Sequence, residues 1–205
     1  FVGDEAHRGD MVWSAAVPEE LRSRATAVIG NFPVSQASQY TRLEWLQTFS
    51  AGVDAYICPG VLPRGTMVTN ASGAYGQSVS EHMFATMWAL MKNLNRYASN
   101  QRDHQWQDEG PVLSPEGGIA LIIGVGDIGS HFAQLAQSVG MRTFGVRRHA
   151  DVPAKGIEKM YGFERLETLL PLADVVAMAV PRSPQTHHLL NADRLGRLKS
   201  TAIVI

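Results

Sequence analysis

Three glycines and two arginines between residues 121 and 150 carry the clearest chemical pattern in this sequence. The glycines form a G-x-G-x-x-G turn that directly follows an apolar run and precedes a segment of helical periodicity. In such a turn the first glycine permits a tight bend, the second lets a pyrophosphate approach the backbone, and the third lets the helix pack closely. The free N–H groups and the partial positive charge at the helix start then attract phosphate. We predict a dinucleotide site made of Gly124, Gly126, Asp127, Ile128 and Gly129, the alternative being a tight turn that holds no ligand.

Arg147 and Arg148 stand where NAD-binding versions of this unit carry an acidic residue at the end of the second strand. An acid there would repel a 2′-phosphate, whereas arginine offers it charge-assisted, fork-shaped hydrogen bonds. Asp151 comes several residues too late to take the place of that acid. The pair therefore favours NADP over NAD, with NAD still possible. The alternative is that both arginines are simply solvated in a loop.

The elements that must position these residues can be read from the surrounding pattern. An apolar strand is expected at 119–123, a helix follows the turn and ends at Gly140, and the next strand is expected at 141–146. The continuous apolar run at 173–180 predicts a further parallel strand that is buried on both faces. Open α/β sheets bind ligands beyond the carboxyl ends of their strands. We therefore add Val180, Pro181 and Thr186 to the expected cofactor contacts.

The first part of the chain has short apolar runs at 26–29, 43–49 and 66–70, separated by turn residues and a short helical stretch at 18–24. This alternation predicts a second, smaller parallel α/β domain. The predicted organisation is a substrate domain at 1–75, an interdomain helix and linker at 76–116, and a dinucleotide-binding domain at 117–205. The fold class is a Rossmann-like doubly wound parallel sheet preceded by a smaller flavodoxin-like α/β domain, with both domains expected to be incomplete.

One long helix of about 20 residues, about 30 Å in length, is predicted after residue 77. Ser78 and Glu81 have the spacing of a capping box. Met83, Met87 and Met91 lie along one apolar stripe, which aromatic residues widen. Such a helix either bridges domains or dimerises, or it covers one sheet.

Composition excludes some classes of function. The 205 residues contain 18 Lys and Arg against 19 Asp and Glu, so nothing indicates a nucleic-acid partner. No apolar run is long enough to predict a membrane span, and no metal site is predicted. The single cysteine, Cys58, cannot form an internal disulfide, so we expect a buried structural thiol and a reducing, cytoplasmic setting.

Four segments taken together resemble the D-isomer-specific 2-hydroxyacid dehydrogenases: LEWLQTFSAGVD, MVTNASGAYGQSVSEHMFATMWALMKNL, IALIIGVGDIG and AVPRSPQTHHLLNADRLGRLKSTAIVI. The resemblance covers nearly the whole chain and departs at Arg147, where many members carry Asp. It implies an NADP-preferring member close to glyoxylate/hydroxypyruvate reductases, a small 2-oxoacid substrate and a homodimer. The substrate carboxylate is then expected at the backbone N–H groups of Ala51, Gly52 and Val53, although a simple strand-ending turn is the alternative there.

The resemblance also implies an arginine, a glutamate and a histidine as catalytic groups, and it places all three beyond Ile205. No histidine of this sequence occupies the matching position. We expect His82, His131, His187 and His188 to be structural or solvated, with His187 the nearest to the cleft. The final apolar run is typical of a buried strand, so we expect the sequence to be part of a longer polypeptide. The 205 residues alone are expected to bind cofactor without turnover.

Two rival functions remain at this point. One is a non-catalytic dinucleotide-binding redox sensor or corepressor-like module on the same fold, because fold does not determine function. The other is a Rossmann enzyme that uses a different nucleotide cofactor. The arginine pair argues against the second rival, because an adenosine compound without a 2′-phosphate does not require it.

Overall fold

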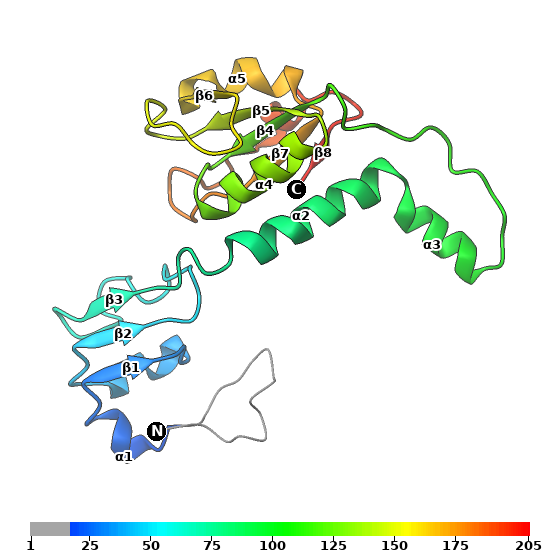
Figure 1. Ribbon diagram of the computed structural model, residues 1–205. Coiled ribbons are helices and arrows are strands. Elements are labelled where there is room, and N and C mark those ends of the chain that lie inside the picture. The colour runs from blue at the N-terminus through cyan, green and yellow to red at the C-terminus, as the bar shows by residue number, and fades with distance from the viewer. Residues whose placement is uncertain (1–16) are drawn as a thin grey trace. The chain divides into compact units, whose positions relative to one another are not determined.

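The computed structural model describes residues 17–205, so the first residues of the predicted substrate domain lie outside the described part (Figure 1). The chain divides into two compact units, the first ending at Ser72 and the second comprising Gly73–Ile205. Each unit has its own sheet and its own core. The predicted domain ranges remain a prediction.

The first unit contains a parallel sheet of three strands within the described residues, in the order β1-β2-β3. Its aromatic core includes Phe32 stacked on Tyr40, with ring centroids 4.3 Å apart. Each strand falls inside one of the predicted apolar runs, and Leu46 at the centre of β2 is buried in this core. The elements are α1 (Glu19–Arg22), β1 (Ala27–Ile29), a 3-10 helix (Val34–Gln39), β2 (Trp45–Gln47) and β3 (Met67–Thr69).

The second unit contains a parallel sheet in the order β6-β5-β4-β7-β8. The central strand, β4, pairs with β5 on one side and with β7 on the other. The strand order therefore reverses at β4, and ligands bind at such a switch point in open α/β sheets. This arrangement confirms the predicted doubly wound parallel sheet. The strands are β4 (Ile119–Ile123), β5 (Arg142–Val146), β6 (Lys159–Tyr161), β7 (Val175–Met178) and β8 (Ile203–Val204).

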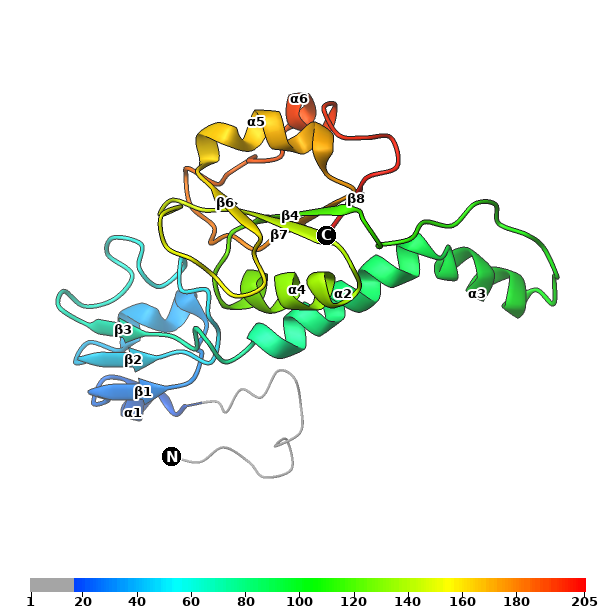
Figure 2. The same ribbon diagram turned by 45° about the horizontal axis from the view of Figure 1, so that its top comes forward.

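Helices cover both faces of this sheet (Figure 2). On one face α4 packs with α2, and their apolar side chains form a core with Ile122 and Val175. On the other face, Leu166, Leu169 and Leu170 pack in the second core. The helical elements are α2 (Gly76–Met91), α3 (Leu94–Arg102), α4 (Asp127–Ser138), 3-10 helices (Phe163–Arg165 and Leu170–Leu172), α5 (Leu166–Leu169) and α6 (Ala192–Leu195).

Asp174 joins three strands at the edge of the sheet where they begin. One carboxylate oxygen accepts a hydrogen bond from the Ile119 N–H at 2.8 Å, and the other accepts one from Lys199 Nζ at 2.6 Å. The Asp174 backbone donates to the Ile119 carbonyl and accepts from the Ile203 N–H. Residues just before β7 thus set its register against both neighbours.

The prediction of one long helix with a capping box is wrong in two respects. It is two helices, α2 and α3, separated by Asn93 in the left-handed conformation at φ 53°. The capping box is also absent: α2 begins at Gly76, and the Ser78 hydroxyl donates to the Tyr75 carbonyl within the first turn. Glu81 instead accepts a hydrogen bond from Gln77 Nε2 at 2.9 Å, an i,i+4 pair on the helix surface.

The methionine stripe of α2 lies against α4 inside the second unit. Met83, Met87 and Met91 are all buried in the core that contains Phe132. This favours the interpretation that the helix covers its own sheet. The stripe therefore gives no support to dimerisation, which remains a prediction from the family resemblance.

Cys58 is exposed, so the expectation of a buried thiol is wrong. It lies in an irregular segment after Asp54, whose carbonyl accepts a hydrogen bond from its Sγ at 3.3 Å. Neighbouring apolar residues such as Ile57 are exposed as well, so the local apolar pattern does not correspond to a strand. None of the helices within residues 17–205 is long and apolar enough to span a bilayer.

Candidate dinucleotide site

The glycine turn connects β4 to α4, and two of its glycines are required by backbone contacts. Gly124 has φ +93°, and a Cβ there would overlap the Ala179 carbonyl on the neighbouring segment. A Cβ on Gly129 would overlap the carbonyl of Gly124 itself. Gly126 differs, because it is exposed and nothing lies within 4 Å of the place where its Cβ would be. Packing requires the first and third glycines, while the second leaves open space in front of the backbone.

The start of α4 presents N–H groups next to that open space. The first helical bond runs from the Ser130 N–H to the Gly126 carbonyl at 3.0 Å. The N–H groups of Asp127, Ile128 and Gly129 precede this bond and so have no partner within the helix. They provide the polarity that suits a phosphate.

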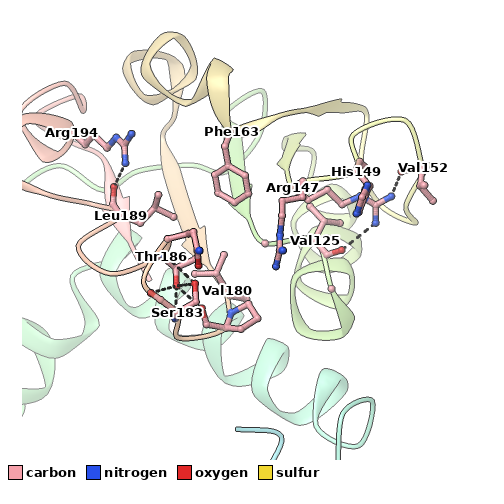
Figure 3. A pocket seen from close by; sticks show the side chains of 16 residues that line it. Val125, Arg147, His149, Val152, Phe163, Val180, Ser183, Thr186, Leu189 and Arg194 are labelled. Atoms are coloured by element: carbon pink, nitrogen blue, oxygen red, sulfur yellow. Dashed lines mark hydrogen bonds between the residues drawn. The ribbon is translucent and has the colours of Figure 1, made fainter. Parts of the chain in front are cut away.

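A cavity of about 1120 Å³ opens beyond the carboxyl ends of β4, β5 and β7 (Figure 3). Single ligand sites in proteins usually measure about 300–1,000 Å³, so the space is ample for an extended dinucleotide. Of the predicted site residues, those in the lining are Gly124, Gly126, Arg147, Arg148, Val180, Pro181 and Thr186.

The two predicted arginines differ in their contacts. Arg147 Nε donates to the His149 carbonyl at 2.9 Å, Nη1 donates to the Val125 carbonyl at 3.4 Å, and Nη2 donates to the Val152 carbonyl (Figure 3). Arg148 also lines the cavity and is exposed. Within residues 17–205, its side chain has no hydrogen-bond or ion-pair partner.

The segment after β7 forms the opposite wall and is held together by Thr186. The Thr186 hydroxyl donates to the Pro181 carbonyl at 2.6 Å and accepts from the Ser183 N–H at 2.9 Å. In turn the Ser183 hydroxyl accepts from the Thr186 N–H at 3.3 Å (Figure 3). Thr186 therefore shapes the wall, while Val180 and Pro181 supply its surface.

Several residues of the wall were not predicted from the sequence. Phe163 and Leu189 contribute apolar surface, and Arg194 donates to the Leu189 carbonyl at 2.7 Å. Arg194 Nε also donates to Glu167 Oε1 at 2.8 Å, and this hydrogen bond, helped by the charge of Arg197, lowers the pKa of Glu167. Phe163 comes two residues after β6, so the carboxyl-end rule would have indicated it had that short strand been recognised. The remaining unpredicted residues are Val125, His149, Val152, Ala179 and Gln185, whereas Ser183 lies in the segment after β7 that was expected on the ligand side.

Two predicted contacts lie away from the lining. The Asp127 carboxylate lies where a Cβ of Gly76 would be and is 3.4 Å from His131 Nδ1. Ile128 packs against the core beneath the turn. Only their backbone N–H groups face the predicted phosphate position.

Among the histidines within residues 17–205, only His149 lines the cavity. His82, His131, His187 and His188 are all exposed. His187 and His188 pack against each other edge to face, with ring centroids 3.9 Å apart.

The predicted substrate loop lies in the first unit, directly after β2. Ala51 and Gly52 are exposed, and Val53 is half-buried. Asn70 Nδ2 donates to the Ala51 carbonyl at 2.7 Å, and the Thr48 hydroxyl donates to the Ser50 carbonyl at 2.8 Å. These side chains turn the carbonyls of the loop toward the protein.

The five-stranded parallel sheet and its glycine turn define a Rossmann-like α/β unit. A family model described as "D-isomer specific 2-hydroxyacid dehydrogenase, NAD binding domain" matches residues 84–205, which is more than half of the chain. The chain belongs to the D-isomer specific 2-hydroxyacid dehydrogenase family.

Individual relatives agree with this assignment. The chain is 26% identical over 198 residues to a glycerate dehydrogenase of Methylorubrum extorquens, covering 92% of this chain and 60% of the relative. It is 28% identical over 172 residues to a glyoxylate reductase of Thermofilum pendens, covering 80% of this chain and 50% of the relative. A crystal structure of a family protein from Aeromonas salmonicida superposes with a TM-score of 0.81 at 30% identity, covering 91% of this chain and 60% of that one. The chain thus spans between 50% and 60% of the length of these relatives.

Proposed function

We propose that the protein is an NADP-preferring oxidoreductase that interconverts a small 2-oxoacid and the corresponding D-2-hydroxyacid. Family membership supports the reaction class, and the glycerate dehydrogenase and glyoxylate reductase among its relatives support a small 2-oxoacid. The observation that carries the cofactor preference is the exposed Arg148 in the cavity wall beyond β5, on a strand end that carries no acid. Its side chain has no hydrogen-bond or ion-pair partner within residues 17–205.

The described residues fit a bound dinucleotide. The open space at Gly126 admits a pyrophosphate, and the three N–H groups at the start of α4 would donate to it. Val180 and Pro181 would contact the cofactor along the wall after β7. A positive side chain beyond β5 would bind the 2′-phosphate with charge-assisted hydrogen bonds.

The substrate end is proposed at the backbone N–H groups of Ala51, Gly52 and Val53, which would donate to the substrate carboxylate. A bound nicotinamide supplies the hydride for the carbonyl carbon, and the protein contributes orientation and electrostatics. An acid must also protonate the new alkoxide. We assign no such acid within this sequence, because the family resemblance places its arginine, glutamate and histidine after the position of Ile205.

The proposal has two further parts. We propose a homodimer from the family resemblance alone. The reducing, cytoplasmic setting is supported by the presence of a single cysteine.

The test uses the full-length protein and measures its affinity for NADPH and NADH. It then follows NADPH oxidation with glyoxylate, hydroxypyruvate and pyruvate. We expect NADPH to bind at least about tenfold more tightly, since one charge-assisted contact contributes about 1.5–3 kcal/mol. Equal affinities would refute the NADP preference. Tight binding of NADPH without turnover of any of the three 2-oxoacids would refute the proposed enzymatic activity and favour a dinucleotide sensor.

A further inference from the structure

Arg147 and Arg148 are adjacent in the chain but differ in what their guanidinium groups contact. The guanidinium group of Arg147 donates to three backbone carbonyls on two segments. One is that of Val125 in the glycine turn, and the others are those of His149 and Val152 in the loop after β5. The Arg147 N–H additionally donates to the Tyr161 carbonyl at 3.1 Å. Arg147 is therefore anchored through both its backbone and its side chain.

The contacts of Arg147 occupy the edge of its guanidinium group that would bind a phosphate side-on. Side-on binding of a phosphate uses the single Nε–H together with one Nη2–H. In Arg147 the Nε–H is donated to the His149 carbonyl, and Nη2 donates to Val152. Turning this edge toward a ligand would leave both carbonyls without their donor. The same movement would remove the Nη1 donor from the Val125 carbonyl. Val125 is buried, and a hydrogen bond lost there is costly.

Arg148 has the opposite character. It is exposed, it lines the same cavity, and within the described residues its five N–H donors have no protein partner. Its charge is therefore available to a ligand without the loss of any existing contact.

We propose that Arg147 is a positioning residue that ties the loop at 147–152 to the glycine turn, and that Arg148 is the specificity-determining residue that binds the 2′-phosphate. The Arg148 half rests on the proposed NADP preference, whereas the Arg147 half does not. The three contacts of the Arg147 side chain, here called the clamp, hold a turn that NADP and NAD would share. Loss of the clamp therefore weakens the binding of both cofactors. Loss of Arg148 weakens the binding of only the cofactor that carries the 2′-phosphate.

The experiment uses probes that need no turnover: adenosine 2′,5′-bisphosphate and adenosine 5′-monophosphate, titrated calorimetrically into the full-length protein. The variants are Arg147→Gln, Arg147→Lys, Arg148→Gln and Arg148→Lys. Arg142→Gln is the matched control, because Arg142 begins the same strand and pairs with Glu158 outside the cavity lining. Amide hydrogen exchange of residues 125 and 147–152 is measured for each variant.

Arg148→Gln is expected to lower the affinity for the bisphosphate by about tenfold to hundredfold. The affinity for the monophosphate should stay within about twofold of the wild-type value. Arg148→Lys keeps the charge and most of the affinity. Arg147→Gln lowers the affinity for both probes by a similar factor and accelerates amide hydrogen exchange in the loop. Arg147→Lys does the same, because an ammonium group cannot reproduce the planar set of three contacts.

Three results would overturn parts of the proposal. A selective loss of the bisphosphate in Arg147→Gln that Arg147→Lys restores would make Arg147 the phosphate ligand. Unchanged loop exchange in Arg147→Gln would refute the clamp, whichever cofactor the protein uses. A wild-type protein that binds both probes equally would refute the NADP preference, and the Arg148 role with it, while the exchange measurement still decides on the clamp.

Discussion

The glycine turn of the second unit and the predicted substrate loop of the first unit each follow the central strand of a parallel sheet, yet they are held in place by opposite means. The turn depends on missing side chains, since a Cβ at Gly124 or Gly129 would overlap a carbonyl oxygen. The loop depends on side chains that are present, since Thr48 and Asn70 hold its carbonyls. The glycine spacing of the turn is a local motif, whereas the loop also depends on Asn70, which is 19 residues away from its acceptor in the sequence.

The sharpest test of this difference compares two glycines within one turn. We expect Gly129→Ala to lower the free energy of unfolding by about 3 kcal/mol, because its Cβ would overlap the immobile Gly124 backbone. Gly126→Ala should change that free energy by no more than about 0.5 kcal/mol, because its site is exposed and open. The same change should lower dinucleotide affinity by more than about tenfold.

Chemical denaturation and calorimetric titration measure the two effects separately. Each of the two variants serves as the control for the other, since both add one methyl group to the same turn. Equal losses of stability would contradict the division between packing glycines and a ligand-facing glycine.

A smaller effect is expected from the loop. Asn70→Ala removes the donor to the Ala51 carbonyl, which is a hydrogen bond of about 0.5–1.5 kcal/mol. If this loop binds the substrate carboxylate, KM for the 2-oxoacid should rise about twofold to tenfold while NADPH affinity stays unchanged. Steady-state kinetics and cofactor titration provide the measurements.

Thr41→Ala is a suitable control for Asn70. The Thr41 hydroxyl also donates to a carbonyl in the first unit, that of Ser23, but lies outside the loop. An unchanged KM in Asn70→Ala would show that the loop does not position the substrate.

The smallest effect concerns a charged contact in the cavity wall, which unlike the turn responds to pH. Arg194 holds the pKa of Glu167 below its usual value of 4.5. The ionised form is favoured in the folded state, so this contact stabilises the fold above pH 4.5 and is lost as the pH falls through the lowered folded value. The thermal midpoints of the wild type and of Glu167→Gln should therefore converge as pH falls from about 6 to 3. A difference that stays constant with pH would contradict the ionic contribution.

Local patterns in the sequence were enough to predict much of the second unit. The apolar run at 119–123 coincides with β4, and Asn191 caps α6 by accepting the Arg194 N–H at 3.0 Å, a role for which Asn is a preferred residue type. Both features depend on residues within a few positions of each other. The glycine turn has the same local origin.

Features that depend on the path of the chain were not predictable in this way. Asn93 interrupts the expected helix without a glycine or proline to indicate it. The strand β6 has three residues and carries Lys159, so its apolar signal is weak. The contacts of Arg147 depend on where the loop at 149–152 returns, and the two arginines consequently looked equivalent in the sequence.

The carboxylate of Asp174 has a consequence for the order of folding. It bonds the Ile119 N–H, 55 residues earlier in the chain, and this contact fixes β7 beside β4. By contrast β4 and β5 are joined through α4 alone, with Ile119 opposite Arg142. Closing the longer loop costs more chain entropy, and contacts of larger sequence separation slow folding. The β4-α4-β5 half that carries the glycine turn is thus expected to form first and to offer the edge on which β7, and then β8, assemble.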